Sequence, residues 1–289
     1  MTIKHLVLSG GGAAGFTVYG ALKYLNKQDF FQLNTIKSIH ACSAGSIIAV
    51  LILLADNWNV LDDYILKRPW DKLINVNPSN ILNIWQNKGI FNENMIKEIL
   101  NPFLQAKELD QNITLKQLYD KNSVEIYMYT TNINSNELET LSLSYKTHPD
   151  LELYNAITMS CAFPLMFMPI YDSSNCYIDG GLLNNFPLND CINLNDNTDE
   201  ILGIKIITNN DNLDTVNSET ILPMYLYNII VKMYRQINKK SREDNLSNIV
   251  NCYIENNSLS RWGDAVVDMS IRQDYINIGE QSAKYFLEN

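Results

Sequence analysis

The chain has 289 residues, of which 46% are hydrophobic, and its 22 basic and 32 acidic side chains give a formal net charge of −10. This length and composition provide for a sizeable buried core, and the acidity argues against a surface that neutralises nucleic-acid phosphates. We therefore expect a globular protein with no nucleic-acid partner.

Cysteine usage and the N-terminus bear on location. The five cysteines include no C-x-x-C pair, which predicts free thiols in a reducing compartment and no zinc site. No basic region followed by a long apolar stretch is visible, and the longest apolar run, 47–55, is shorter than the roughly 20 residues that span a bilayer. These features predict a cytoplasmic protein, soluble or peripherally membrane-associated, without signal peptide or transmembrane segment. Secretion as an effector by a non-classical route stays open.

In chain order, strand-like runs alternate with helical patterns, which predicts an α/β fold with a mostly parallel central sheet. The strand-like runs are 4–9, 36–42, 124–131, 139–145, 176–179, 201–208 and 249–254. The helical patterns are 13–27, 44–66 with a break, 93–105, 115–121, 151–159, 221–240 and 276–287. Because no repeat or linker divides the chain, we expect a single domain over 1–289. Its core would span about 3–210, and a helical region about 215–289.

A glycine-rich turn follows the first predicted strand. Gly10, Gly12 and Gly15 have the spacing of a dinucleotide-binding loop, but such a site also needs an acidic residue at the end of the second strand. That strand runs into a serine instead. Alternatively, the backbone N–H groups of Gly10, Gly11 and Gly12 form an oxyanion hole. A third interpretation is a tight turn that only lets the helix pack on the strand.

Ser43 lies between the second predicted strand and an apolar helix. A serine on such a turn projects its hydroxyl from the sheet edge, and small neighbours such as Ala41 and Gly45 let a substrate carbonyl approach. This pattern indicates a nucleophile elbow, with Ala41 in place of the first glycine of G-x-S-x-G. Small-residue turns also join strands to helices in many folds.

Asp179 ends the strand at 176–179 and precedes Gly180 and Gly181. A carboxylate at a strand end can reach a site at the carboxyl edge of an open α/β sheet, where it would meet Ser43. The alternative is an Asx-type turn in which the aspartate only caps local backbone.

The three histidines do not complete a conventional triad. An α/β-hydrolase runs serine, acid, histidine along the chain, and no histidine follows Asp179. We expect His148 in a surface loop and His40 in a structural role. What remains is a serine served directly by a carboxylate.

Together, these segments resemble the patatin-like lipid acyl hydrolases, and the resemblance covers nearly the whole chain. Residues 10–15 are similar to the family's G-G-G-x-R-G loop, 43–46 to the end of its G-T-S-A-G-S elbow, and 179–181 to its D-G-G/A motif. Weaker similarities are 89–91 to G-L-F, 160–164 to S-x-A-x-P, and Asn185-x-Pro187 to the usual continuation after D-G-G.

The resemblance implies a three-layer patatin-like fold and a calcium-independent phospholipase A-type serine lipid acyl hydrolase without metal or cofactor. Ser43 would be the nucleophile and Asp179 the general base. The supporting roles would fall to Gly10, Gly11 and Gly12 in the oxyanion hole, and to Gly15, Ala41, Gly45, Gly180 and Gly181 in the motifs. The expected partners are a phospholipid or other acyl-lipid substrate and a peripheral membrane surface. The alternatives are a catalytically inactive or activator-dependent lipid-binding homologue and a nucleotide-binding α/β domain.

Two departures from the family pattern bear on substrate choice. Ala14 stands where the family usually has arginine, which removes a positive charge that could attract an anionic headgroup. The Ala41 methyl is small enough for the elbow turn but is expected to crowd the substrate slightly.

Two apolar segments are candidates for the rim of a lipid site, 165–170 and 221–234, and burial in the core is the favoured interpretation of the second. A basic cluster overlaps and follows the second segment, formed by Lys232, Arg235, Lys239, Lys240 and Arg242.

Overall fold

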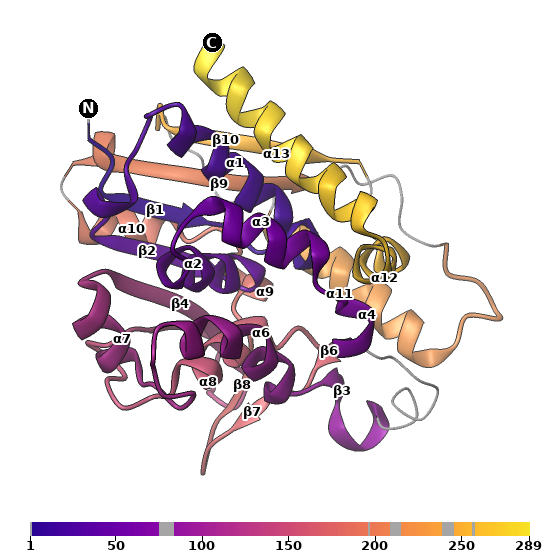
Figure 1. Cartoon of the computed structure of the whole chain (residues 1–289). Helices are drawn as coiled ribbons and strands as arrows, with labels where there is room; N and C mark the ends of the chain where they lie inside the picture. The colour runs from indigo at the N-terminus through magenta and orange to yellow at the C-terminus, as the bar shows by residue number, and fades with distance from the viewer. Residues whose placement is uncertain (1, 75–83, 196, 209–214, 239–245, 256–257) are drawn as a thin grey trace.

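A central eight-stranded sheet organises the computed structural model, which describes residues 2–74, 84–195, 197–208, 215–238, 246–255 and 258–289 (Figure 1). Its path runs β10, β9, β1, β2, β4, β8, β7, with β5 also paired to β4. The strands are β1 (His5–Leu8), β2 (Ser38–Cys42), β4 (Glu125–Asn132), β5 (Glu139–Leu143), β7 (Ile170–Tyr171), β8 (Cys176–Asp179), β9 (Ile201–Thr208) and β10 (Ile249–Ile254).

The five strands from β10 to β4 are mutually parallel, and β5, β8 and β7 pair antiparallel. This confirms the predicted α/β fold with a mostly parallel sheet. Every residue of β1 and β2 is buried, as expected for parallel strands covered on both faces.

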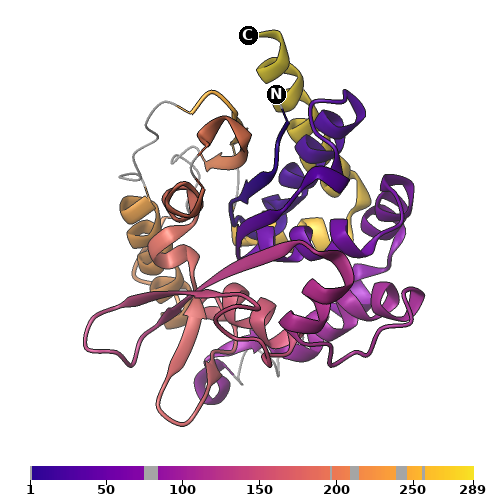
Figure 2. The ribbon, with the colours of Figure 1, turned by 90° about the vertical axis from the view of Figure 1, so that its left-hand side faces the viewer.

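Helices cover both faces of the sheet and give the three layers that the sequence predicted (Figures 1 and 2). One face carries α1 (Gly15–Lys27), α2 (Ala44–Leu54), α8 (Leu153–Cys161) and α13 (Met269–Glu288), with α3 (Trp58–Lys67) and α6 (Glu93–Ala106) packed outside them. The opposite face carries α9 (Gly181–Asn184) and α10 (Leu188–Leu194). Helix α11 (Leu222–Asn238) packs against α9, and Figure 2 shows it, in orange, on the side opposite α1 and α13.

Two hydrophobic clusters lie on the two faces of the sheet. Leu6 and Leu8 of β1 belong to the large cluster beneath α1, whereas Val7 packs with Phe186 and Leu188 beneath α10. This division follows from the alternation of side chains along a strand.

Helices α1 and α13 cross with their backbones in close contact at two glycines. A Cβ atom on Gly20 would lie 2.2 Å from the Ile276 carbonyl oxygen, and one on Gly279 would lie 2.0 Å from the Thr17 carbonyl oxygen. Lys23 adds ion pairs from α1 to Asp62 at 3.0 Å and to Glu280 at 3.2 Å. Helix α13 therefore packs closely on α1 and also contacts β10.

The remaining elements are short. Strands β3 (Gly89–Phe91) and β6 (Leu165–Phe167) pair with each other outside the main sheet, and neither was predicted. Other helical segments are η1 (Gly12–Ala14), η2 (Leu33–Thr35), α4 (Trp70–Leu73), α7 (Leu115–Asn122), η3 (Thr198–Glu200) and α12 (Leu259–Val267). Within the described parts of the chain, no helix has the length and apolar character needed to cross a bilayer.

Candidate active site

Ser43 occupies a strained turn between β2 and α2. Its φ of 51° and ψ of −127° lie in a region that L-residues rarely adopt and that is found at strand-to-helix nucleophile turns. The turn is tight because α2 starts directly against the backbone of β1. A Cβ atom on Gly45 would lie 2.8 Å from the carbonyl oxygens of both Leu8 and Ser9. The serine side chain is thereby held off the end of the sheet.

A serine network supports this turn from below. The Ser43 N–H donates to Ser160 Oγ at 3.0 Å, and Ser160 Oγ lies 3.0 Å from Ser46 Oγ. Ser46 in turn donates to the Ala41 carbonyl at 3.1 Å. The backbone N–H of Ser43 therefore has a hydrogen-bond acceptor on α8. Ser160 lies in the segment that is similar to S-x-A-x-P, but the sequence alone indicated no role for its hydroxyl.

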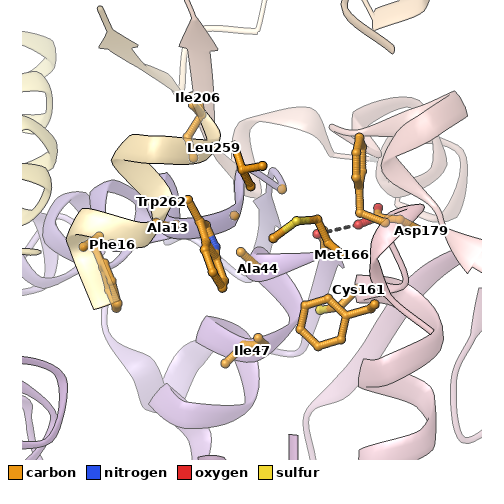
Figure 3. A pocket seen from close by; sticks show the side chains of 18 of the residues that line it. Ala13, Phe16, Ala44, Ile47, Cys161, Met166, Asp179, Ile206, Leu259 and Trp262 are labelled. Carbon is orange, nitrogen blue, oxygen red and sulfur yellow. Dashed lines mark hydrogen bonds between the residues drawn. The ribbon is translucent and has the colours of Figure 1, made fainter. Parts of the chain in front are cut away.

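The structure brings Ser43 and Asp179 together. The Ser43 hydroxyl donates to Asp179 Oδ2 at 2.6 Å, shown by the dashed line in Figure 3.

The direction of the strand that carries Asp179 differs from the one predicted. Asp179 is not carried by a parallel strand ending at a common edge, because β8 runs antiparallel to β4. Strand β5 occupies one edge of β4. The other edge of β4 pairs with β2 over residues 125–129 and with β8 over residues 130–132. The two strands meet end to end, with Cys42 opposite Tyr129 and Asp179 opposite Thr130.

Asp179 is enclosed, with 2% of its surface exposed. Its Oδ1 atom accepts from the Gly181 N–H at 2.7 Å and lies 3.8 Å from the Cys42 sulfur. Burial raises the pKa of Asp179 to about 6, and hydrogen bonds from Ser43, Gly181 and Cys42 oppose that rise. The carboxylate is therefore more basic than an exposed aspartate and is still ionised at neutral pH.

The glycine-rich loop packs between Ser43 and Asn185. The Gly10 N–H donates to the Asn185 carbonyl at 3.2 Å, and Asn185 Nδ2 donates back to the Gly10 carbonyl at 3.1 Å. A Cβ atom on Gly10 would lie 2.8 Å from Ser43 Cβ, so only glycine allows this approach. The Gly10 N–H, predicted as an oxyanion donor, is engaged by Asn185. Gly11 and Gly12, the latter with φ of 57°, continue the loop along the cavity wall.

The other predicted motif residues have packing roles. A Cβ atom on Gly15 would meet Ala44 Cβ at 2.9 Å, and one on Gly180 would meet the Tyr129 carbonyl at 2.3 Å. Ala41 is fully buried in β2 and does not line the cavity, so the expected crowding of the substrate by its methyl group is wrong.

A cavity of about 260 Å³ opens in front of Ser43 and Asp179. Its walls are largely apolar and come from α1, α2, α3, α6 and α12, as well as from the glycine loop. Figure 3 shows Asp179 on one side of the cavity, Phe16 and Trp262 on the far side, and Met166 and Ile47 between them. Such a site suits a long hydrocarbon group next to a nucleophile.

Three charged side chains are found among the residues that line the cavity: Asp179, Arg235 and Arg272. Arg272 is 4% exposed and donates to the carbonyl oxygens of Ile65, Ala265, Val266 and Leu66 at 2.7 to 3.1 Å. Its charge is committed to the backbone, which gives it a structural role.

Among the described residues that line the cavity there is no histidine and no second carboxylate. His40 is buried, with Nδ1 at 2.8 Å from the Tyr129 hydroxyl and its ring stacked on Tyr127, and burial lowers the pKa of His40 to about 3. This confirms its expected structural role. The described residues contain no group of three histidine, cysteine, aspartate or glutamate side chains that could hold a metal ion.

Helix α11 contradicts the predicted burial of its apolar residues. One side lines the cavity with Tyr227, Val231 and Tyr234. The opposite side exposes a stripe at helical spacing, formed by Leu222, Tyr225, Leu226, Ile229, Met233 and Ile237. Of the basic cluster, Lys239, Lys240 and Arg242 lie outside the described residues.

Asn238 at the end of α11 fixes the helix to the site. Its Oδ1 atom accepts from the Asn185 N–H at 2.9 Å, and its Nδ2 donates to the Gly181 carbonyl at 2.9 Å. These two hydrogen bonds could not be predicted from the sequence, because no local pattern pairs residues so far apart in the chain.

Comparison with known proteins places these features in a wider group. The family model described as patatin-like phospholipase matches residues 6–192, which include the glycine loop, Ser43 and Asp179. An uncharacterized protein of Acanthamoeba polyphaga mimivirus is 28% identical over 273 residues, covering 94% of this chain and 87% of that protein. A protein of Invertebrate iridescent virus 6 named probable lipid hydrolase is 31% identical over 187 residues, covering 64% and 62%. The crystal structure of VipD from Legionella pneumophila aligns with a TM-score of 0.59 at 17% identity, over 99% of this chain and 67% of that one.

Proposed function

The chain belongs to the patatin-like phospholipase family, and from this we propose that it hydrolyses fatty-acyl esters of phospholipids or related acyl lipids through Ser43 and Asp179. The observation that carries the proposal is the 2.6 Å hydrogen bond between these side chains, on a strained turn over an apolar cavity. A serine whose hydroxyl is held by a buried carboxylate is arranged for attack on an ester.

In the first half of the reaction, Ser43 Oγ bonds to the acyl carbon while its proton moves to Asp179 Oδ2. The tetrahedral intermediate then breaks its bond to the alcohol oxygen of the lipid, which takes the proton from Asp179. In the second half, Asp179 accepts a proton from water, whose oxygen attacks the acyl-serine. Breakdown returns a proton to Ser43 Oγ and releases the fatty acid.

The negative charge on the intermediate would be held by the loop backbone. We assign this role to the Gly11–Gly12 stretch of the glycine loop, which lines the cavity together with Ser43. The N-terminal end of α2, directly after Ser43, adds a favourable partial positive charge. Each well-placed donor contributes about 3 kcal/mol to the transition state. No step requires a metal ion.

The stripe on the outer side of α11 would contact a membrane. Six large apolar side chains are exposed there, while the other side of the same helix lines the cavity. A bilayer is the partner that would both cover such a stripe and supply a lipid to the adjoining cavity. We therefore assign this helix to the membrane-facing rim of the site.

The test is fatty-acid release from mixed phospholipid vesicles in the presence of EDTA, comparing the intact protein with Ser43→Ala and Asp179→Ala. Ser218→Ala and Asp150→Asn, both at exposed positions, serve as matched controls. Release by the intact protein and both controls, but by neither site variant, supports the proposal. Equal release by Ser43→Ala would overturn it, and no release from any protein despite vesicle binding would favour an inactive or activator-dependent homologue.

A further inference from the structure

Arg235 differs from the other two charged groups of the cavity because, among the described residues, no side chain or backbone group forms a hydrogen bond or ion pair with its guanidinium. Its Nη1 atom is buried without a hydrogen bond, and in the described part of the chain no hydrogen bond or ion pair is formed by its side chain. Arg272, the other arginine of the cavity, is satisfied by four backbone carbonyls. An unpaired, half-buried guanidinium is costly unless a ligand supplies the opposite charge.

Among the described residues, no carboxylate is paired with Arg235. Asp179 is the one carboxylate among the residues that line the cavity, and its oxygens are occupied by Ser43, Gly181 and Cys42. The groups that act electrostatically on Arg235 are the hydroxyls of Tyr227 and Tyr234. Burial lowers the pKa of the Arg235 guanidinium, but an arginine keeps its proton throughout the physiological range.

The position of Arg235 suits the polar end of a lipid. It is partly exposed and lies on α11, whereas the deep wall of the cavity is formed by side chains such as Ile65 and Ile99, which are at most 4% exposed. A lipid with its acyl chain against that wall and its ester carbonyl at Ser43 would direct its glycerol and headgroup toward solvent. A phosphate in that region would meet the guanidinium.

We propose that Arg235 is the phosphate-binding residue of the site and makes the enzyme prefer glycerophospholipids over neutral glycerides. This inference rests on the proposed lipid hydrolase function. The planar guanidinium would hold two phosphate oxygens at once, as arginine does at phosphate sites. Position 14 of the loop, where the family usually has arginine, is here a fully buried alanine without charge. Arg235 would supply a positive charge from α11 instead.

The test compares two substrates with identical acyl chains, dioctanoylphosphatidylcholine and dioctanoylglycerol, in neutral detergent micelles. For Arg235→Gln we expect kcat/KM on the phospholipid to fall about 10- to 100-fold, the size of one charge-assisted interaction. Turnover of the neutral glyceride should change less than about two-fold. Arg235→Lys should recover part of the loss. Lys121→Gln, which removes an exposed charge on α7, should leave kcat/KM unchanged on both substrates. Equal losses on both substrates, or on neither, would overturn the proposal.

A binding measurement separates this inference from the proposed hydrolysis. In the Ser43→Ala background, dioctanoylphosphatidylcholine should bind about 10-fold more weakly when Arg235→Gln is added, with dioctanoylglycerol unaffected. This arm holds even if the intact protein releases no fatty acid. Inorganic phosphate is the control for binding of a free anion. If Arg235→Gln weakens the binding of phosphate but does not change the affinity for the phospholipid, the headgroup assignment is rejected.

Discussion

Ser43, the proposed nucleophile, has an unfavourable backbone conformation. With φ of 51° and ψ of −127°, the residue occupies a region that glycine adopts without strain. We expect Ser43→Gly to be more stable than Ser43→Ala by about 1 kcal/mol, because both lose the hydroxyl and only glycine relieves the strain. Urea unfolding of the two variants measures the difference. Equal stabilities would mean that the turn is not strained.

The raised pKa of Asp179 predicts how activity depends on pH. In the proposed mechanism Asp179 accepts the Ser43 proton and has to be ionised to do so, so kcat/KM should fall about ten-fold per pH unit below a pKa of about 6. A profile measured on a soluble ester between pH 4 and pH 8 tests this. An activity that stays constant to pH 4 would contradict it.

The same pKa predicts a stability effect of opposite sign to the usual one for a carboxyl group. Burial raises the folded-state pKa of Asp179 from 3.8 to about 6, so protonation favours the folded protein, and this stabilisation is lost as pH rises from about 4 to 6. Asp179→Asn should therefore be more stable than the intact protein at pH 8, by up to about 3 kcal/mol. The difference should vanish near pH 4 when unfolding is compared at both values.

We predict a kinetic role for the side chain of Asn185, which lines the cavity and holds the glycine loop. Asn185→Ala removes the hydrogen bond to the Gly10 carbonyl and leaves space beside the loop, so we expect kcat to fall about ten-fold with a smaller change in KM. The control is Asn184→Ala, whose amide contacts Asp190 instead. Loss of activity in both variants to the same degree would indicate a general effect on α9.

At the scale of elements, helix α11 has one side that lines the cavity and an opposite side that exposes apolar side chains to solvent. Met233 is 59% exposed on its outer side, so Met233→Glu should weaken hydrolysis of vesicle lipids at least about ten-fold, while turnover of p-nitrophenyl butyrate should not change. Leu138→Glu is the matched control, because Leu138 is also 59% exposed but lies in the turn before β5. If both variants behave alike on vesicles, the α11 stripe is not the membrane contact.

The sequence was sufficient to predict the long elements and the three motifs, because hydrophobic periodicity and glycine spacing are local. Strands β8, β9 and β10 have the predicted bounds. The direction of β8 was not predictable, since pairing is decided by distant residues rather than by the strand's own pattern. For the same reason the hydrogen-bond partners of Asn185 and the lack of one for Arg235 Nη1 could not be predicted. Strands β3 and β6, with three residues each, are too short to show the alternation of a strand.

At the scale of the whole molecule, the crossing of α1 and α13 ties the two halves of the chain together. Gly279→Ala would place a methyl group 2.0 Å from the Thr17 carbonyl, and we expect a loss of about 1–3 kcal/mol in the free energy of unfolding. Gly263→Ala in α12 is the control, because a Cβ atom there meets nothing within 4 Å and the better helix former should stabilise by up to about 1 kcal/mol. Urea titration followed by circular dichroism gives both values.

The same crossing sets when the site can first exist during translation. Helix α1 follows the glycine loop, yet its outer surface packs on α13, and Arg272 of α13 joins the cavity wall to α3. A nascent chain still on the ribosome, with α13 not yet emerged, lacks that wall although Ser43 and Asp179 have long been made. The cavity wall in front of Ser43 is therefore completed only after α13 has been made and has packed on α1 and α3.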